Sequence, residues 1–219
     1  MNGTTNSSDE VGLSALVTWL DAFRTAVTEQ RAYLTELDSA IGDADHGANM
    51  ARGMAAVMEK LGTSTPSTAD ELFKSVGMTL VTSVGGASGP LYGTFFLRMG
   101  MTAGAVADFD GAALAAALRA GLDGIVARGK AEAGDKTMFD ALNPALDAFD
   151  AALAGGASIP DAASAAADAA EAGRDATLPL VARKGRASYL GERSAGHLDP
   201  GSASSALLMR TLADTLRSP

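Results

Sequence analysis

Apolar residues recur along the chain at the three- and four-residue intervals of amphipathic helices. Eight segments show this pattern, and none shows the strict alternation of a strand or a hairpin dipeptide. The first helix is expected at about 11–34, the second from the end of the aspartate-rich loop to 61, and the third after a cap at Ser67 or Thr68. The fourth is expected at 91–107, the fifth after a cap at Asp110, and the sixth at 138–153. The seventh is expected at 160–180 and the eighth along Leu208, Leu212 and Leu216. The pattern predicts an all-α fold, an antiparallel bundle of eight helices.

The connections between these helices differ in composition. Successive antiparallel helices end alternately at opposite ends of a bundle. The loops 37–47, 84–90, 129–137 and 191–201 all follow odd-numbered helices, so they are expected at the same end, and they are rich in glycine and polar residues. That end of the bundle is therefore the candidate site.

Composition narrows the class of protein further. The chain has 219 residues, 47% of them hydrophobic but only 5% aromatic, a formal charge of −9 and no cysteine. Small helix-forming residues fit closely packed helices, the negative charge disfavours nucleic acid and anionic membranes, and thiol chemistry is excluded. Residues 1–10 are polar and predict a disordered lead-in rather than a secretory signal, and residues 11–219 predict one domain. No apolar run is long enough to span a membrane, so a cytoplasmic location is expected.

The stretch LDSAIGDADHGANM, residues 37–50, concentrates Asp38, Asp43 and Asp45 in eight residues. On one helix, Asp38 and Asp43 would point about 140° apart, so a loop that folds back brings them together better. Converging carboxylates need a cation, and oxygen ligands without cysteine or paired histidine suit Mg²⁺ or Ca²⁺. The alternative is that these aspartates cap helix ends and face water. His46 follows at a helix start, where it is a candidate phosphate contact.

Two further segments have the chemistry of a phosphate site. Glycines in GGASGP, residues 85–90, let the backbone approach a ligand closely, and the helix start behind them offers unpaired N–H groups. Positive charge is concentrated at residues 183–186. Each segment also has an ordinary interpretation, as a chain turn and as a solvated helix end. GIVARGK, residues 124–130, lacks the features of a P-loop, and Asp135-Lys136-Thr137 lacks the context of a phosphorylated aspartate.

Four separated segments together resemble one family. LDSAIGDADHGANM, GGASGPLYG, GDKTMFDALNPA and ARKGRASYLGERSAGHLDPGS are similar, in the same order, to the L subunits of bacterial dihydroxyacetone kinases. The resemblance covers the chain beyond its polar start. It implies a barrel of eight antiparallel helices, with a nucleotide and two Mg²⁺ ions bound at one end.

The resemblance also implies roles for individual residues. The metal ligands would be Asp38, Asp43 and Asp45. The nucleotide contacts would be His46, Gly47, Ala48, Asn49, Ala87, Ser88, Gly129, Met138, Arg186, Asp199, Pro200 and Gly201.

The resemblance implies a subunit that transfers a phosphoryl group from bound nucleotide to dihydroxyacetone held on a separate K subunit. In the phosphoenolpyruvate-dependent version, ADP stays bound as a cofactor and a phosphohistidine M subunit rephosphorylates it. Two alternatives stay open: a kinase subunit that uses exchangeable ATP, acting on dihydroxyacetone or on a ketose such as erythrulose, and a nucleotide-state sensor that binds a transcriptional regulator. An acidic helical scaffold without a nucleotide would be a third.

Overall fold

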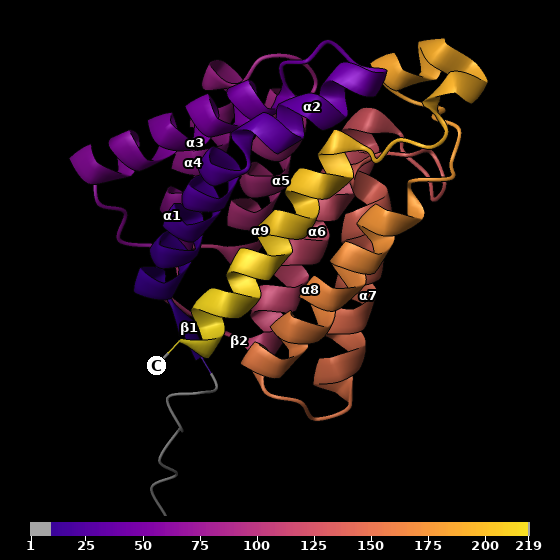
Figure 1. The fold of residues 1–219 in the computed structure, drawn as a ribbon. Helices are drawn as coiled ribbons and strands as arrows, with labels where there is room; N and C mark the ends of the chain where they lie inside the picture. Colours follow the sequence, from indigo (N-terminus) through magenta and orange to yellow (C-terminus); the bar gives the residue numbers. More distant parts are fainter. Residues whose placement is uncertain (1–9, 219) are drawn as a thin grey trace, which may run out of the picture.

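The computed structural model describes residues 10–218, which form nine α-helices, one 3₁₀ segment and two short strands (Figure 1). The first nine residues of the expected lead-in lie outside the described residues. The elements are β1 Glu10–Gly12, α1 Leu13–Glu29, α2 Arg31–Ile41, α3 His46–Thr63, α4 Ala69–Ser83, α5 Ser88–Ala103, β2 Asp108–Asp110, α6 Gly111–Gly129, α7 Met138–Ala154, α8 Ile159–Ala176, η1 Arg186–Ser194 and α9 Pro200–Arg217. The all-α prediction is confirmed.

The long helices pack in an order that closes on itself. From α3 to α9 each helix packs on the next one in the chain, α9 packs on α1, and α1 packs on α3. The core between them is apolar and includes Trp19, Phe73 and Phe96, all without solvent exposure. Trp19 Nε1 donates a hydrogen bond of 2.9 Å to the carbonyl oxygen of Leu208, which joins the first and last helices.

The first predicted helix, 11–34, is wrong in detail. The structure has two helices there, α1 and α2, with a break at Gln30, whose φ and ψ of −92° and 12° are not helical. Gln30 is neither glycine nor proline, the residues that usually mark the end of a helix in a sequence. Because the apolar stripe also continues past Gln30, the sequence gives no local sign of the break. Because of the break, α2 takes its own direction across the top of the view in Figure 1 and packs on α3.

The expectation of no strands is also wrong. Glu10–Gly12 pairs antiparallel with Asp108–Asp110, with Val11 opposite Phe109. Three residues per strand are too few for a periodic signal, and both Val11 and Phe109 are buried against the helices. The pair lies at the end of the molecule away from α2 and η1 (Figure 1).

Two helices begin at the caps that the sequence suggested, while the helix expected at 91–107 begins and ends earlier, as α5. Asp110 Oδ1 accepts the N–H of Ala113 at 2.7 Å and caps α6, as predicted. Thr68 holds the N-cap position of α4, although its hydroxyl donates to Asp70 instead of accepting a backbone N–H. Between residues 10 and 218, none of the helices has the length and apolar character that crossing a bilayer requires.

Candidate functional site

A cavity of about 460 Å³ opens where the helix ends near α2 and η1 meet. It has the size of a small-molecule site. All four loops that were predicted to share one end contribute to its walls. The lining residues are Asp38, Ile41, Gly42, Asp43, Asp45, His46, Gly85, Gly86, Ala87, Ser88, Pro90, Leu91, Tyr92, Ile125, Arg128, Gly129, Ala131, Lys136, Thr137, Met138, Lys184, Gly185, Arg186, Ala187, Asp199, Pro200 and Gly201.

The three aspartates of the first motif converge on this cavity. One carboxylate oxygen from each of Asp38, Asp43 and Asp45 lies within 4.8 Å of the others. Asp38 belongs to the last turn of α2, while Asp43 and Asp45 lie in the link to α3. The predicted loop at 37–47 is therefore shorter than expected, because α2 continues to Ile41. The inference that one helix cannot present all three carboxylates agrees with this arrangement.

Asp38 is held by hydrogen bonds from the backbone. Its Oδ2 accepts the backbone N–H groups of Asp45 at 2.8 Å and His46 at 3.0 Å, so the carboxylate fixes the path of the link. Its side chain is buried, and a Cβ on Gly42 would collide with its Oδ1. Its position is therefore set by the backbone on both sides.

The donor set fits a hard divalent cation. Three carboxylates supply oxygen ligands alone, which suits Mg²⁺. Arg186 Nε lies 2.9 Å from Asp43 Oδ2 and neutralises part of the same charge. This arginine is 68% exposed and comes from the start of η1, so the basic segment at 183–186 reaches across the cavity to the aspartates.

Gly47 places the start of α3 directly against α2. A Cβ at residue 47 would collide with the carbonyl oxygen of Arg31 and crowd Thr35, both on α2. The absence of a side chain lets the two helix backbones come close. The carboxylate on α2 and the helix start on α3 thereby reach the same cavity wall.

The glycine-rich loop 84–87 forms the next wall. Gly86 has a φ of +65°, a conformation that favours glycine, and α5 begins at Ser88. Asn49 lies under this loop, since a Cβ on Gly85 would be 3.2 Å from its side-chain nitrogen. Arg52 Nη2 donates to Asn49 Oδ1 at 2.6 Å and its Nε donates to the carbonyl of Ser83 at 3.1 Å. Asn49 therefore supports the loop and does not line the cavity.

His46 is buried between two hydroxyl groups. Its Nδ1 lies 3.0 Å from Ser88 Oγ, and its Nε2 lies 2.9 Å from Ser204 Oγ on α9. Burial lowers the pKa of His46, and the nearby charges of Asp38 and Asp45 oppose that change. Burial also raises the pKa of Tyr92 to about 12, and its hydroxyl bonds to Ser204 and Ser205.

The remaining lining includes apolar side chains and a buried carboxylate. Met138, at the first position of α7, lines the cavity with Ile125 and Leu91. Asp199 caps α9, accepting the N–H of Ser202 at 2.6 Å. Burial is the main cause that raises the pKa of Asp199 to about 7.

The sequence analysis missed Lys136, which lines the cavity although its triplet was dismissed there. Its Nζ donates to the carbonyl oxygens of Ser194 at 2.7 Å, Leu180 at 2.9 Å and Leu178 at 3.4 Å. Burial lowers its pKa, and the charge of Asp199 opposes that effect. A lysine in a polar loop gives no signal of burial in the sequence.

Of the fifteen predicted site residues, twelve line the cavity. Gly47, Ala48 and Asn49 do not: Gly47 contacts α2, Asn49 lies under Gly85, and Ala48 borders a shallow groove with Thr28 and Ser39. The backbone N–H groups of Gly47 and Ala48 still belong to the first turn of α3.

The sequence model of the DAK2 domain matches residues 40–214 of this chain. The chain is 46% identical over 202 residues to "PEP-dependent dihydroxyacetone kinase, ADP-binding subunit DhaL" of Escherichia coli, covering 90% of this chain and 94% of that protein. It is also 46% identical over 204 residues to the PTS-dependent DhaL subunit of Lactococcus lactis, covering 93% and 98%. The chain therefore belongs to the DhaL family of DAK2-domain proteins.

More distant relatives are larger proteins. The chain is 37% identical over 208 residues to the L-erythrulose 1-kinase of Mycolicibacterium smegmatis, covering 92% of this chain and 35% of that enzyme. Among solved structures it matches the dihydroxyacetone kinase of C. freundii in complex with AMP-PNP and Mg²⁺, with a TM-score of 0.71 and 27% identity, covering 98% of this chain and 36% of that one.

Proposed function

We propose that this chain is the nucleotide- and magnesium-binding subunit of a dihydroxyacetone kinase. It would transfer a phosphoryl group to dihydroxyacetone held on a separate K subunit, with ADP as a bound cofactor that phosphoenolpyruvate ultimately rephosphorylates. The observation that carries the proposal is the convergence of three carboxylates and a glycine-rich helix start on one cavity. Identity of 46% to phosphoenolpyruvate-dependent subunits, against 37% to an erythrulose kinase, supports this version.

Asp38, Asp43 and Asp45 would hold the Mg²⁺ ions, and we propose two. Bound Mg²⁺ neutralises the terminal phosphates during transfer. The backbone N–H groups on Asp38 and the guanidinium on Asp43 already hold two of the three carboxylates in place. Arg186 would add positive charge at the phosphates once a metal pairs with Asp43.

The nucleotide would occupy the rest of the cavity. His46, Ser88 and the first-turn N–H groups of α3 at Gly47 and Ala48 would bind the phosphates. The N–H of Asn49 donates to the carbonyl oxygen of Asp45 at 2.9 Å, so Asn49 would act through its side chain. The nucleoside would contact Ala87, Gly129 and Met138 and the turn Asp199, Pro200 and Gly201. Phosphoryl transfer depends mainly on positioning and charge, so this chain needs no nucleophile of its own.

The proposal requires partners. Dihydroxyacetone would be presented by the K subunit, and a phosphohistidine M subunit would rephosphorylate ADP in place. A transcriptional regulator could read the nucleotide state of the same pocket. We propose these protein partners and a cytoplasmic location. We do not propose that the chain binds nucleic acid or a membrane.

The test starts with denaturing the purified protein and identifying released nucleotide. Stoichiometric ADP that survives dialysis supports the cofactor version, and a protein that binds ATP reversibly supports the ATP-dependent alternative. The purified chain is then combined with K and M subunits, dihydroxyacetone and the phosphoenolpyruvate system. Triose phosphate formation is expected; nucleotide binding without turnover would instead support the sensor alternative.

A further inference from the structure

Positive charge is concentrated in two short segments of this acidic chain. Residues 128–130 and 183–193 together contain six of its 17 lysines and arginines but only one of its 26 acidic residues. They therefore carry a formal charge of +5 in a chain whose total is −9. Both segments border the cavity, since Gly129 and Lys184 belong to its lining. We call these two segments the basic rim.

Three cations of the basic rim, Lys130, Arg183 and Arg193, are exposed and stand outside the cavity lining. The first two are direct neighbours in the chain of lining residues. Arg193 precedes Ser194, whose carbonyl oxygen accepts from Nζ of Lys136 at 2.7 Å. These three charges therefore lie beside the cavity and face solvent rather than a nucleotide inside it.

Carboxylates neutralise arginines elsewhere in the molecule but largely not at the basic rim. Three arginines on the bodies of α6, α8 and α9 form ion pairs with carboxylates: Arg119, Arg174 and Arg210. Within residues 10–218, neither Lys130 nor Arg193 has a carboxylate oxygen within 4.0 Å, and Arg183 has one at 3.9 Å, from Asp135. The charge of the rim is therefore available to an anionic partner.

Tyr189 adds an aromatic ring to the basic rim. It is 87% exposed, more than any other large hydrophobic residue in the described part of the chain. It follows Arg186 by three residues in η1, and residues three apart lie on the same side of a 3₁₀ helix. Because Arg186 pairs with Asp43 at the cavity, Tyr189 lies on the side of η1 that faces the cavity mouth. Tyrosine is enriched where proteins bind one another.

The segment that carries Tyr189 is fixed at its base. Ser194 Oγ accepts the N–H of Ala182 at 2.8 Å and donates to the carbonyl oxygen of Gly191 at 2.6 Å. Lys136 joins the carbonyl oxygens of Leu180 and Ser194. In Figure 1, η1 stands out from the bundle beside the end of α2, on which it packs. A projecting surface that is already ordered loses little entropy when a partner binds.

We propose that Lys130, Arg183, Tyr189 and Arg193 form a docking surface for the phosphohistidine protein that rephosphorylates the bound ADP. This role rests on the proposed function, and charge identifies the partner. Dihydroxyacetone is uncharged, so its approach needs no cations outside the cavity. The donor instead brings an anionic phosphoryl group to a nucleotide that is already anionic, on a chain whose net charge repels anions.

The docking surface acts before the chemical step. In that step the P–N bond of phosphohistidine breaks while an oxygen of the terminal phosphate of ADP bonds to phosphorus. The imidazole leaves with its electron pair and takes up a proton. The docking surface raises the rate at which the donor reaches the cavity, because a basic patch attracts an anionic partner over a distance. The face of the donor around its phosphohistidine is expected to be acidic.

The test measures the donor reaction and the acceptor reaction separately. The chain with bound ADP is mixed with excess phosphorylated M subunit, and ATP formation is followed in a single turnover at salt concentrations from about 0.1 M upward. Combining Lys130→Glu with Arg193→Glu should lower the second-order rate constant at least about tenfold at the lowest salt and flatten its salt dependence. The same chain, preloaded with ATP, should transfer to dihydroxyacetone on the K subunit at the wild-type rate.

Two further variants separate docking from other effects. Lys60→Glu is the matched control, an exposed charge reversal on α3 roughly 21 Å along the helix from His46, beyond the screening distance of about 10 Å. It should keep both rates. Tyr189→Ser should slow the donor reaction and leave the affinity for ADP unchanged. A loss of ADP affinity would place Tyr189 in the nucleotide site and overturn its role in docking.

An unchanged donor reaction in the double variant overturns the proposal. A loss in the acceptor reaction, alone or as large as the loss in the donor reaction, overturns it as well, because the surface then serves the K subunit. Arg193→Glu alone is measured against the same criteria if the double variant does not fold. A wild-type chain that holds ADP but is not rephosphorylated contradicts the proposed function instead. Direct binding of the phosphorylated M subunit to wild type and variant then still decides on the docking surface.

Discussion

Asp38→Asn is the most informative change at the aspartates. The carboxylate accepts two backbone N–H groups through Oδ2, and the amide oxygen of asparagine can accept the same two. The NH₂ group then replaces the other carboxylate oxygen, and it donates hydrogen bonds and cannot bind a cation. The link between α2 and α3 is kept while the ligand and its charge are lost.

The size of the effect follows from ligand linkage. ADP and Mg²⁺ at 100 times the dissociation constant stabilise a folded protein by about 2.7 kcal/mol. For a chain of 219 residues this raises the Tm by about 5–11 °C. Loss of one carboxylate ligand should weaken the binding of Mg·ADP at least about a hundredfold. Loss of a residue that only hydrogen-bonds to a metal ligand already weakens metal binding by up to about a hundredfold. The stabilisation then falls to about 0.4 kcal/mol, or roughly 1–2 °C.

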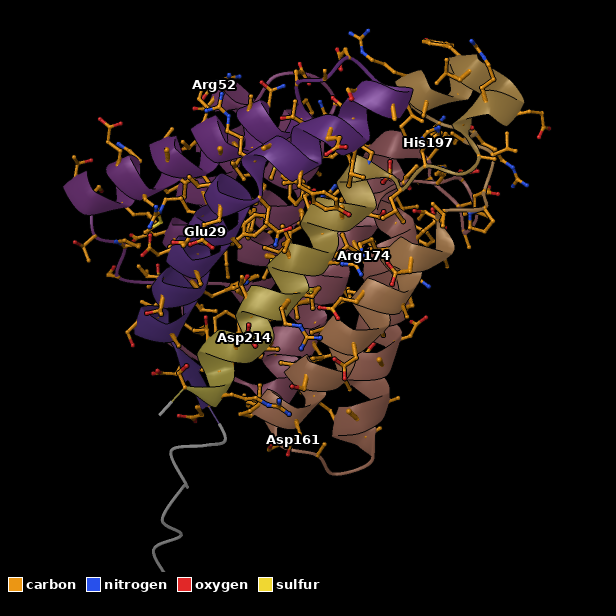
Figure 2. The ribbon with its side chains drawn as sticks, viewed as in Figure 1. Glu29, Arg52, Asp161, Arg174, His197 and Asp214 are labelled. Atoms are coloured by element: carbon orange, nitrogen blue, oxygen red, sulfur yellow. The ribbon has the colours of Figure 1, made fainter. Side chains whose placement is uncertain are left out.

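The assay is thermal unfolding with and without Mg·ADP, followed by circular dichroism. Asp214→Asn is the control: it makes the same chemical change on an exposed position of α9, roughly 21 Å along the helix from Pro200 and at the other end of the molecule (Figure 2). The control should retain the full shift in Tm. Asp38→Asn that is stabilised by Mg·ADP as strongly as the wild type would refute the assignment of Asp38 as a metal ligand.

Three further predictions concern residues in and around the cavity. Asp199 binds a proton more tightly when folded, with a pKa of about 7 against about 3.9 in an unfolded chain, so stability should fall as pH rises between these values. Urea midpoints at pH 5 and pH 8 should differ less in Asp199→Asn, and an equal difference contradicts the burial argument. Lys136→Met leaves the carbonyls of Leu180 and Ser194 without their donor, and we expect a loss of about 2–4 kcal/mol in urea unfolding; a loss below about 0.5 kcal/mol is inconsistent with this role. Gly47→Ala should cost about 1–3 kcal/mol by forcing α3 away from α2, while Gly62→Ala, on the same helix with open space around it, should not destabilise, and equal effects would count against the contact.

The sequence was informative wherever the signal was local. Apolar periodicity located the long helices, and the Asp110 cap follows from residues close in the chain. The three aspartates were recognisable because they lie within eight residues, and oxygen ligands without cysteine indicate a hard cation. The family resemblance then extended the site to residues that had no local signal of their own.

Features that depend on distant contacts were not readable. The break at Gln30 has no glycine or proline, and it appears only once α2 packs on α3. Ser204 lies 158 residues from His46, and the serines of α9 read as ordinary polar positions. Lys136 was misjudged because its burial depends on carbonyl oxygens more than 40 residues later in the chain.

The bond from Trp19 to Leu208 makes the chain's one tryptophan an intrinsic reporter. Its indole is buried where the first and last helices meet, so its fluorescence follows the joining of the two ends of the chain. The same last helix begins with Asp199, Pro200 and Gly201 in the cavity wall. Separation of the terminal helices would thus disturb the binding site directly, and a change in tryptophan emission should accompany loss of ligand binding during unfolding.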